Sequence, residues 1–228
     1  MLADSDFPGE ETHEVWPSLA DLLAASAMIF LVLLGVVLYQ RAVDAGTLTT
    51  FRRELLAALN SVPEAQRKLF QIDSGSQFVR IVLQEDVTFP TARYEFADLK
   101  PEGRKALGEI GKILGRRDID TLYQLVEVVG HTDQVRIYNP RFTNWELSAM
   151  RAAAVVRLLV HYVGVDPCRI TASGAGPYFP RRVPPDLPNL AENRRIEILI
   201  LPARPSDRSG HDRCYLRGDS TPIPGRVQ

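Results

Sequence analysis

The sequence predicts an α/β (α+β) two-layer sandwich preceded by a single N-terminal transmembrane helix. One observation is an apolar run over residues 19–39 that contains a single charged residue. The other is a region in which strand-like segments alternate with amphipathic helical segments, which is typical of helices packed on one sheet. The predicted divisions are an N-terminal arm (1–18), a transmembrane helix (19–40), a juxtamembrane helix or linker (41–72), a folded domain (73–201) and a C-terminal tail (202–228).

The bulk composition narrows the classes of function. The 228 residues carry a net charge of −1, so composition gives no reason to expect nucleic-acid binding. The two cysteines, Cys168 and Cys214, are too few for a disulfide scaffold or a set of zinc ligands. They can form one disulfide if both lie in an oxidising compartment; the alternative is two unpaired thiols. No metal site and no cofactor are expected.

The apolar run, LADLLAASAMIFLVLLGVVLY, is long enough to span a membrane. At ~1.5 Å per residue its 21 residues cover about 30 Å, the thickness of a hydrocarbon core. Trp16 precedes it, Tyr39 ends it and Arg41 follows it, as expected at the two interfaces. A cleaved signal peptide has a basic start and a shorter apolar stretch, whereas here the preceding arm is acidic. The run is therefore interpreted as an uncleaved anchor.

Asp21 is the one charge inside this anchor. An ionised carboxylate within a membrane costs at least ~2.5–3.5 kcal/mol, so such a residue usually faces a protein interior or a watery path. Asp21 is then a candidate proton carrier. The alternative is that Asp21 lies at the headgroup level as part of a solvated helix end.

The linker and the folded domain are assigned from their periodicity. An apolar stripe at Leu48, Phe51, Leu55 and Leu59 predicts a helix over 42–70, interrupted at Pro63. In the domain, Pro101 suits the first turn of a helix. The tail is rich in proline and glycine and is expected to be poorly ordered. The domain is predicted to contain strands at 78–83, 122–129, 169–172 and 195–201, an extended stretch at 87–89, and helices at 101–115 and 144–163.

Several motifs follow one another in the domain, and together they resemble the OmpA C-terminal family. They are Gly130–Asp133 (GHTD), Asn144–Ala152 (NWELSAMRA), Arg169–Ile170, Gly174–Gly176 (GAG) and Asn193–Glu197 (NRRIE).

This resemblance implies peptidoglycan binding through the diaminopimelate of the stem peptide, which offers an ammonium beside a carboxylate. Asp133 would bind the ammonium and Arg151 the carboxylate, as a guanidinium fork suits a carboxylate. Asn144 would cap its helix and expose backbone N–H groups to the carboxylate. Arg194 or Arg195 would add a second cation, and Thr132 precedes the acid. The gap from Asp133 to Arg151 resembles MotB-type domains more than porin-type ones.

The segment from Trp16 to Val32 resembles the start of MotB-type stator subunits, and its five-residue Trp–Asp spacing resembles the ZorB subunits of the Zorya anti-phage system. The resemblance implies that Asp21 binds the translocated ion, most simply a proton. It also implies a multi-span MotA/ZorA-like partner around a homodimer, with the linker as a dimer contact or channel plug. The location implied is the bacterial inner membrane, crossed once, with the C-terminal domain in the periplasm.

Two points remain open at the level of sequence. The arm is acidic, whereas Arg41, Arg52 and Arg53 follow the helix, so the positive-inside rule favours the orientation opposite to that of the family. The second point is function: a passive tether binding peptidoglycan without ion flow fits the same domains. An enzyme is not expected, because no Ser/His/Asp, Cys/His or paired-carboxylate arrangement stands in a suitable frame.

Overall fold

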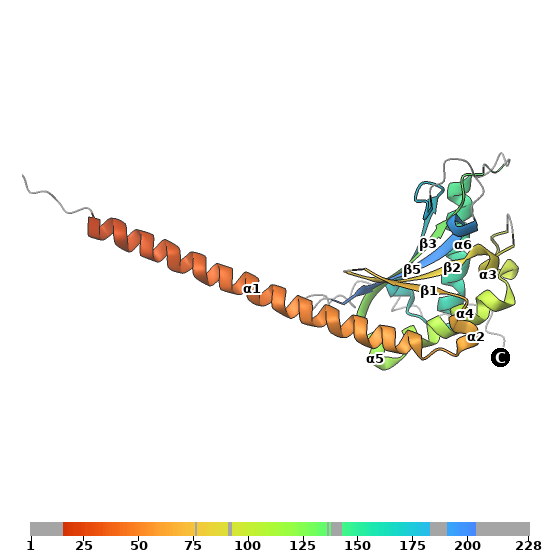
Figure 1. Ribbon diagram of the computed structural model, residues 1–228, viewed down its shortest axis with the longest axis horizontal. Coiled ribbons are helices and arrows are strands. Elements are labelled where there is room, and N and C mark those ends of the chain that lie inside the picture. The colour runs from red at the N-terminus through yellow and green to blue at the C-terminus, as the bar shows by residue number, and fades with distance from the viewer. Residues whose placement is uncertain are drawn as a thin grey trace, which may run out of the picture. The chain divides into compact units, whose positions relative to one another are not determined.

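The computed structural model describes residues 16–75, 77–90, 93–135, 137, 143–182 and 191–203. By its internal contacts the chain forms two compact units, residues 1–45 and 46–228 (Figure 1). The predicted arm (up to residue 15) and nearly all of the predicted tail (from residue 204), with Cys214, lie outside the described residues.

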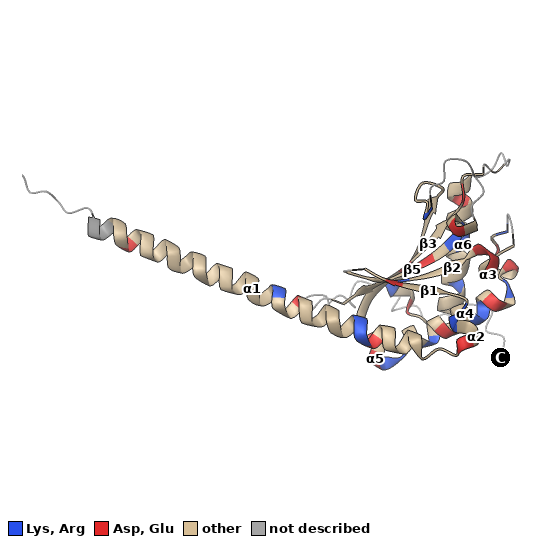
Figure 2. Cartoon of the chain, in the orientation of Figure 1, with Lys and Arg blue, Asp and Glu red and all other residues tan. Residues whose placement is uncertain are grey.

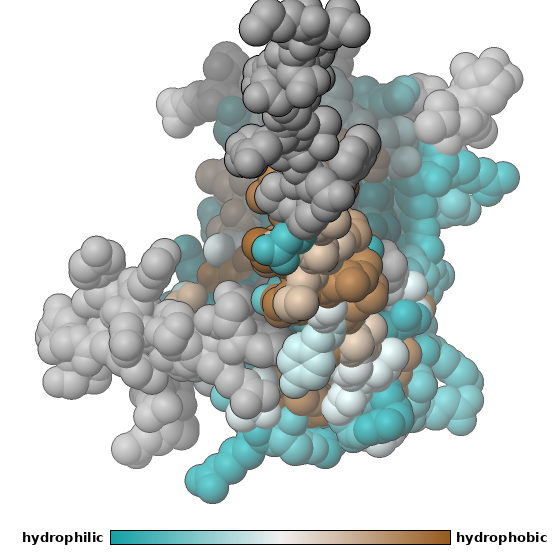
Figure 3. Space-filling model, turned by 90° about the vertical axis from the view of Figure 1, so that its left-hand side faces the viewer, coloured by the Kyte–Doolittle hydropathy of each residue, from teal (hydrophilic) through white to brown (hydrophobic). Residues whose placement is uncertain are grey.

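The first unit is described as a helix, the beginning of α1 (Trp16–Asn60). Every side chain from Leu19 to Ala45 is exposed, and most of those before residue 40 are apolar. Charged residues are sparse along this part of α1 in Figure 2, and its uncovered apolar side chains are brown in Figure 3. Ser26 donates its hydroxyl to the Leu23 carbonyl (2.8 Å), so this polar group is satisfied within the helix. Within the described part of the chain, one helix is long and apolar enough to cross a membrane, and it is this one.

The last turns of α1 belong to the second unit. Phe51, Leu55 and Leu59 recur every four residues and are buried in the core of the domain. Of the two interpretations of the apolar stripe, the structure therefore favours packing on the chain's own domain. The compact unit begins at Gly46 rather than at the predicted boundary of 73, because these side chains supply part of the core. The helical pattern is interrupted at Pro63 as predicted: α1 ends at Asn60, and Pro63 is the N-cap of the short helix α2 (Glu64–Arg67).

A five-stranded sheet, in the order β1-β2-β5-β3-β4, forms one layer of the domain. All neighbouring strands are antiparallel except β3 and β4, which are parallel. The carboxyl ends of β3 and β4 therefore lie at the same end of the sheet, which is where the candidate site forms. The strands are β1 (Gln71–Ser74), β2 (Val79–Gln84), β3 (Tyr123–His131), β4 (Ile170–Gly176) and β5 (Arg195–Pro202).

The helical layer covers one face of this sheet. α6 (Asn144–Leu158) packs on β3 and β4, and α4 (Pro101–Leu114) packs beside α6. Strand β5 alternates, with Ile196, Ile198 and Ile200 in the hydrophobic core, while Arg195 and Glu197 are buried on the opposite face. The predicted two-layer α/β sandwich is confirmed.

The extended stretch predicted at 87–89 is wrong for its first two residues. Here the chain turns into α3 (Glu85–Thr88), and Phe89 alone is extended. The turn begins where the β2–β5 ladder ends, since Glu85 donates its N–H to the Arg194 carbonyl (2.8 Å). The remaining short elements are η1 (Phe96–Asp98), α5 (Arg117–Asp120), the π-helical turn η2 (Leu159–Val163), η3 (Pro167–Arg169) and η4 (Ala191–Asn193).

Candidate functional site

The candidate site begins at the loop that follows β3. The Thr132 N–H donates to the Gly176 carbonyl (3.0 Å), which holds this loop against the end of β4. Asp133 comes next and is 7% exposed; its Oδ1 accepts a hydrogen bond from the Val135 N–H (3.1 Å). This local bond fixes the carboxylate at the end of the strand. The hydroxyl of Thr132 is buried and has no hydrogen-bond partner among the described residues.

The first turn of α6 is fixed by a cap that differs from the predicted one. Thr143, not Asn144, is the N-cap, because its side chain accepts from the Trp145 N–H (3.2 Å). The Glu146 carboxylate in turn accepts from the Thr143 N–H (2.7 Å), completing a capping box. Asn144 instead donates its Nδ2 to the carbonyls of Asp133 (3.3 Å) and Val135 (2.9 Å). It therefore ties the helix to the loop that carries the acid.

Arg151 lies two turns into α6 and is 3% exposed. Its Nε donates to the Arg93 carbonyl (2.9 Å), its Nη2 pairs with Glu85, and its guanidinium lies over the Phe89 ring at 5.7 Å. Burial lowers the pKa of Arg151 from its usual value, and the Glu85 carboxylate opposes that shift. The guanidinium is thus held in place by groups from outside its own helix.

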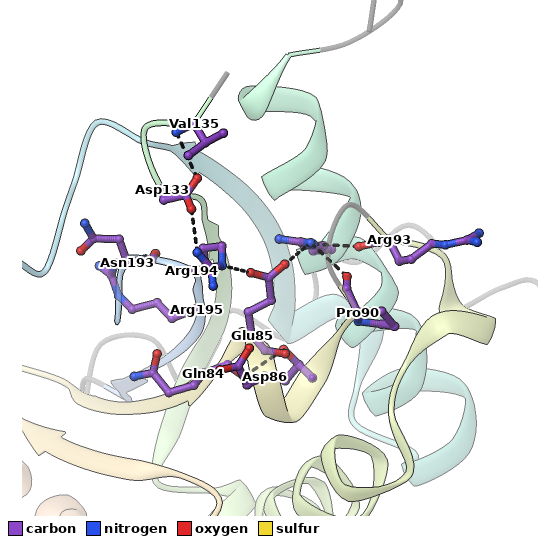
Figure 4. Close-up of polar contacts among 12 residues, drawn as sticks. Gln84, Glu85, Asp86, Pro90, Arg93, Asp133, Val135, Asn193, Arg194 and Arg195 are labelled. Carbon is purple, nitrogen blue, oxygen red and sulfur yellow. Dashed lines mark hydrogen bonds and ion pairs between the residues drawn. The ribbon is translucent and has the colours of Figure 1, made fainter. Parts of the chain in front are cut away.

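Glu85 connects the two predicted ligand residues. One of its oxygens pairs with Arg151 and the other with Arg194, while Arg194 Nη1 lies 2.7 Å from Asp133 Oδ2. These four residues, in the order Arg151–Glu85–Arg194–Asp133, are here called the ion-pair network. Figure 4 shows its members Glu85, Arg194 and Asp133 and the contacts that join them. Burial works against the charge of Arg194, but hydrogen bonding and attraction from Asp133 and Glu85 raise its pKa above the usual value.

Two positive and two negative side chains alternate in this network, so their charges balance. Burying such groups is costly, and removing one partner of a buried pair typically costs about 3–5 kcal/mol. Arg194 is the most accessible member, with its side chain 19% exposed. A ligand approaching the network would therefore contact Arg194 and then the groups that it holds.

Glu85 was missed by the sequence analysis. The signal was present, because Glu85 and Asp86 directly follow the buried strand VRIVLQ, and charges at a strand end are candidates for a site. What the sequence did not reveal is that Glu85 is 4% exposed and faces two arginines.

Arg195 does not join the network, which corrects the expectation that either arginine could serve. It lies on the other face of β5, where its Nε pairs with Glu197 Oε1 (2.6 Å) and its Nη2 donates to the Phe179 carbonyl (3.1 Å). Arg194 is therefore the second cation beside Asp133.

Two other predicted functional residues, Asp21 and Cys168, are not members of the ion-pair network. Asp21 is exposed on α1 in the first unit. Cys168 lies in η3, and its N–H donates to the Asp166 side chain (2.9 Å); its predicted pairing with Cys214 stays a prediction. Within the described ranges, no three His, Cys, Asp or Glu side chains gather as a group that could hold a metal ion.

The sequence of the second unit is similar to known proteins. Residues 94–183 match the model of the OmpA family. Motility protein B of Bacillus subtilis is 40% identical over 76 residues, which are 33% of this chain and 29% of that protein. The matches to the first curated relatives span 29–59% of their lengths. The second unit thus carries an OmpA-like domain with homologues among MotB proteins.

Solved structures agree on the fold. A putative MotB-like protein from Desulfovibrio vulgaris has a TM-score of 0.58 at 25% identity, covering 72% of this chain and 99% of that one. The cell wall anchor of the T6SS from Pseudomonas aeruginosa has a TM-score of 0.51 at 25% identity, covering 67% of this chain and 97% of that one.

Proposed function

We propose that this chain is a peptidoglycan-anchored stator-type subunit of the bacterial inner membrane, whose OmpA-like domain binds the diaminopimelate of the stem peptide. The observation that carries the proposal is the ion-pair network at the carboxyl end of β3. It joins Asp133 and Arg151, which are 18 residues apart in the sequence, through Glu85 and Arg194. The motifs around these residues resemble those of peptidoglycan-binding OmpA domains.

The chemistry of the network matches a ligand with adjacent opposite charges. The ligand carboxylate would bind the Arg151 guanidinium in a planar, charge-assisted contact, and the ligand ammonium would bind Asp133. Both groups already have internal partners, so binding would be an exchange. Arg194, the accessible member, would leave Asp133 as the ammonium arrives, while Glu85 would keep Arg194 close. This role is one of binding, not of catalysis.

The membrane end of the chain supports the rest of the proposal. Asp21 would carry the translocated ion, taken to be a proton, between this helix and a multi-span MotA/ZorA-like partner assembled around a homodimer. One charge crossing 100 mV yields about 2.3 kcal/mol, enough to change contacts between partners. The five-residue Trp–Asp spacing favours an antiviral, ZorB-like subunit over a flagellar one. The OmpA-like domain would then lie in the periplasm, where it can hold the cell wall.

The proposal is tested by co-sedimentation of the full-length protein with purified sacculi, with the diaminopimelate tripeptide as competitor. Arg151→Ala should weaken binding more than tenfold, because a hydrogen-bonded contact to a charged group contributes about 1.5–3 kcal/mol. Asp133→Asn should weaken binding similarly while preserving the shape of the side chain. Arg157→Ala is the matched control, since Arg157 lies on the same helix and is exposed.

The fold of each variant is checked by circular dichroism, because Arg151→Ala leaves one side of Glu85 without its partner. If Arg151→Ala unfolds, Asp133→Asn still provides the test. In that variant Arg194 keeps its ion pair with Glu85, so the domain should stay folded. Folded Arg151→Ala and Asp133→Asn proteins that bind sacculi as well as the wild type would move the wall-binding site elsewhere.

A further inference from the structure

A pair of exposed aromatic side chains lies on the segments that adjoin the loop of Asp133. Trp145 and Tyr178 stack with ring centroids 5.1 Å apart and planes inclined by 26°, and they are 45% and 64% exposed. Trp145 is the second residue of α6, and Tyr178 comes two residues after β4. We call this pair the aromatic platform. Nothing in the ion-pair chemistry described above uses it.

Two routes connect the aromatic platform to the acid of the network. Asn144, which precedes Trp145, donates to the Asp133 carbonyl at 3.3 Å. On the other side both rings flank Gly176, where an added Cβ would lie 3.5 Å from an atom of each ring. The Gly176 carbonyl accepts from the N–H of Thr132, the neighbour of Asp133. The platform is therefore continuous with the loop that carries Asp133.

The size of the platform limits what it can hold. An aromatic side chain covers roughly 150–250 Å², so two that are about half exposed offer on the order of 200 Å². A stable contact with a second protein buries at least ~1,200 Å² in total, so these rings alone are too small for one. They are large enough for one or two sugar rings, whose C–H faces stack on aromatic rings while their hydroxyl groups stay in water.

We propose that the aromatic platform is a glycan subsite, on which a sugar of the peptidoglycan strand stacks while its stem peptide occupies Asp133 and Arg151. This inference rests on the proposed function. Diaminopimelate is the third residue of the stem peptide, and three extended residues reach at most about 10 Å. The sugar that carries the peptide therefore lies within reach of the diaminopimelate, and the platform is connected to Asp133 through Asn144 and Gly176. The domain would then bind both the glycan strand and the stem peptide of the cell wall.

The test compares two synthetic ligands by titration calorimetry with the full-length protein in detergent. One is the diaminopimelate tripeptide, and the other is the same tripeptide attached to the amino-sugar disaccharide. The wild type should bind the disaccharide form on the order of tenfold more tightly, as expected for about 1.4 kcal/mol from stacking. Tyr178→Ala should remove this gain and leave the affinity for the free tripeptide unchanged, whereas Tyr178→Phe should keep it.

Tyr162→Ala is the matched control. Tyr162 is 63% exposed and stacks on Phe96 with centroids 4.9 Å apart, but it lies at the other end of the α6 region, in η2. The inference is overturned if the wild type binds both ligands equally, if Tyr178→Ala keeps the gain, or if Tyr162→Ala loses it as well. It is also overturned if Tyr178→Ala lowers the oligomer mass in sedimentation, which would make the rings a contact between copies. If the wild type binds neither ligand, the proposed function itself fails.

Discussion

At the scale of single residues, the face of the sheet away from the helices holds a second buried group of charges. His131, the last residue of β3, lies opposite Arg195 in the strand register, and its Nε2 is 3.8 Å from Glu197 Oε2. Neither ring nitrogen has a hydrogen-bond partner among the residues that the structure describes. Burial, with the nearby charges of Arg195 and Arg80, lowers the pKa of His131 to about 4, and Glu197 opposes the shift. The imidazole is therefore neutral in the folded domain near pH 7.

This histidine should make the domain less stable in mild acid. Below the ordinary pKa of 6.5 the unfolded chain binds a proton that the folded chain does not, so stability is lost as the pH falls from about 6.5 to about 4. The full effect is at most about 3 kcal/mol for a shift of this size. Urea unfolding at pH 7.5 and pH 5 should show a smaller loss in His131→Gln than in the wild type. An equal loss in both proteins would assign the acid sensitivity to other groups.

The sequence pointed to some members of the ion-pair network and not to others, and their role in binding stays a prediction. Asp133 and Arg151 were predicted from short motifs, because their neighbours in the chain also fix their surroundings. The role of Glu85 depends on its contact with Arg151, 66 residues away in the sequence. The choice between Arg194 and Arg195 depends on a contact of Arg194 with Asp133, 61 residues away, and on the face of the sheet to which Arg195 points. Such contacts leave no local pattern. The cap at Thr143 was also missed, since Asn and Thr are both common N-cap residues.

At the scale of elements, α6 lies unusually close to β3. A Cβ added to Gly130 would lie 2.0 Å from the Ser148 carbonyl oxygen, and one added to Gly174 on β4 would lie 2.7 Å from the Ala149 nitrogen. Both neighbours are backbone atoms of α6, which cannot move by changing a rotamer. The glycines of the GHTD and GAG motifs therefore allow the helix to approach, and this approach brings Asn144 and Arg151 to the carboxyl ends of the strands.

Gly130→Ala should accordingly destabilise the domain by about 3 kcal/mol or more, since α6 must shift away from the sheet. Gly108→Ala is the control: Gly108 lies on α4 with no atom within 4 Å of an added Cβ, so alanine there should stabilise the helix by up to about 1 kcal/mol. Chemical denaturation of both variants measures the two changes. Wild-type stability in Gly130→Ala would show that the close approach is not needed.

Among the elements, the long periodic ones were predicted and the short ones were not. The helices at 101–115 and 144–163 and the four predicted strands correspond to elements of the structure within a few residues. The strand β1 was missed because its four residues, Gln71–Ser74, are largely polar and lie at the edge of the sheet. The turn α3 was missed because its shape follows from the end of the β2–β5 ladder.

At the scale of the whole molecule, the two functional interpretations differ in what Asp21 does. If the chain carries ions, Asp21→Asn should abolish proton uptake in cells that also produce a multi-span partner, with sacculus binding unchanged. Asp44→Asn is the matched control, because Asp44 lies on the same helix beyond the apolar run and is exposed. Proton uptake is followed with a pH-sensitive dye. Wild-type behaviour of Asp21→Asn, together with loss of the cellular phenotype in Asp133→Ala, would leave a passive tether as the function.

The burial of Phe51, Leu55 and Leu59 also determines what a neighbouring molecule could touch on the last turns of α1. These three side chains are buried in the domain core. The exposed residues on the same turns of the helix are Arg53, Glu54, Ala57 and Asn60. Any subunit that docks against this stretch would contact charged, polar and small side chains and not a continuous apolar surface. Such an association would loosen as the ionic strength rises, because exposed charges are screened by salt.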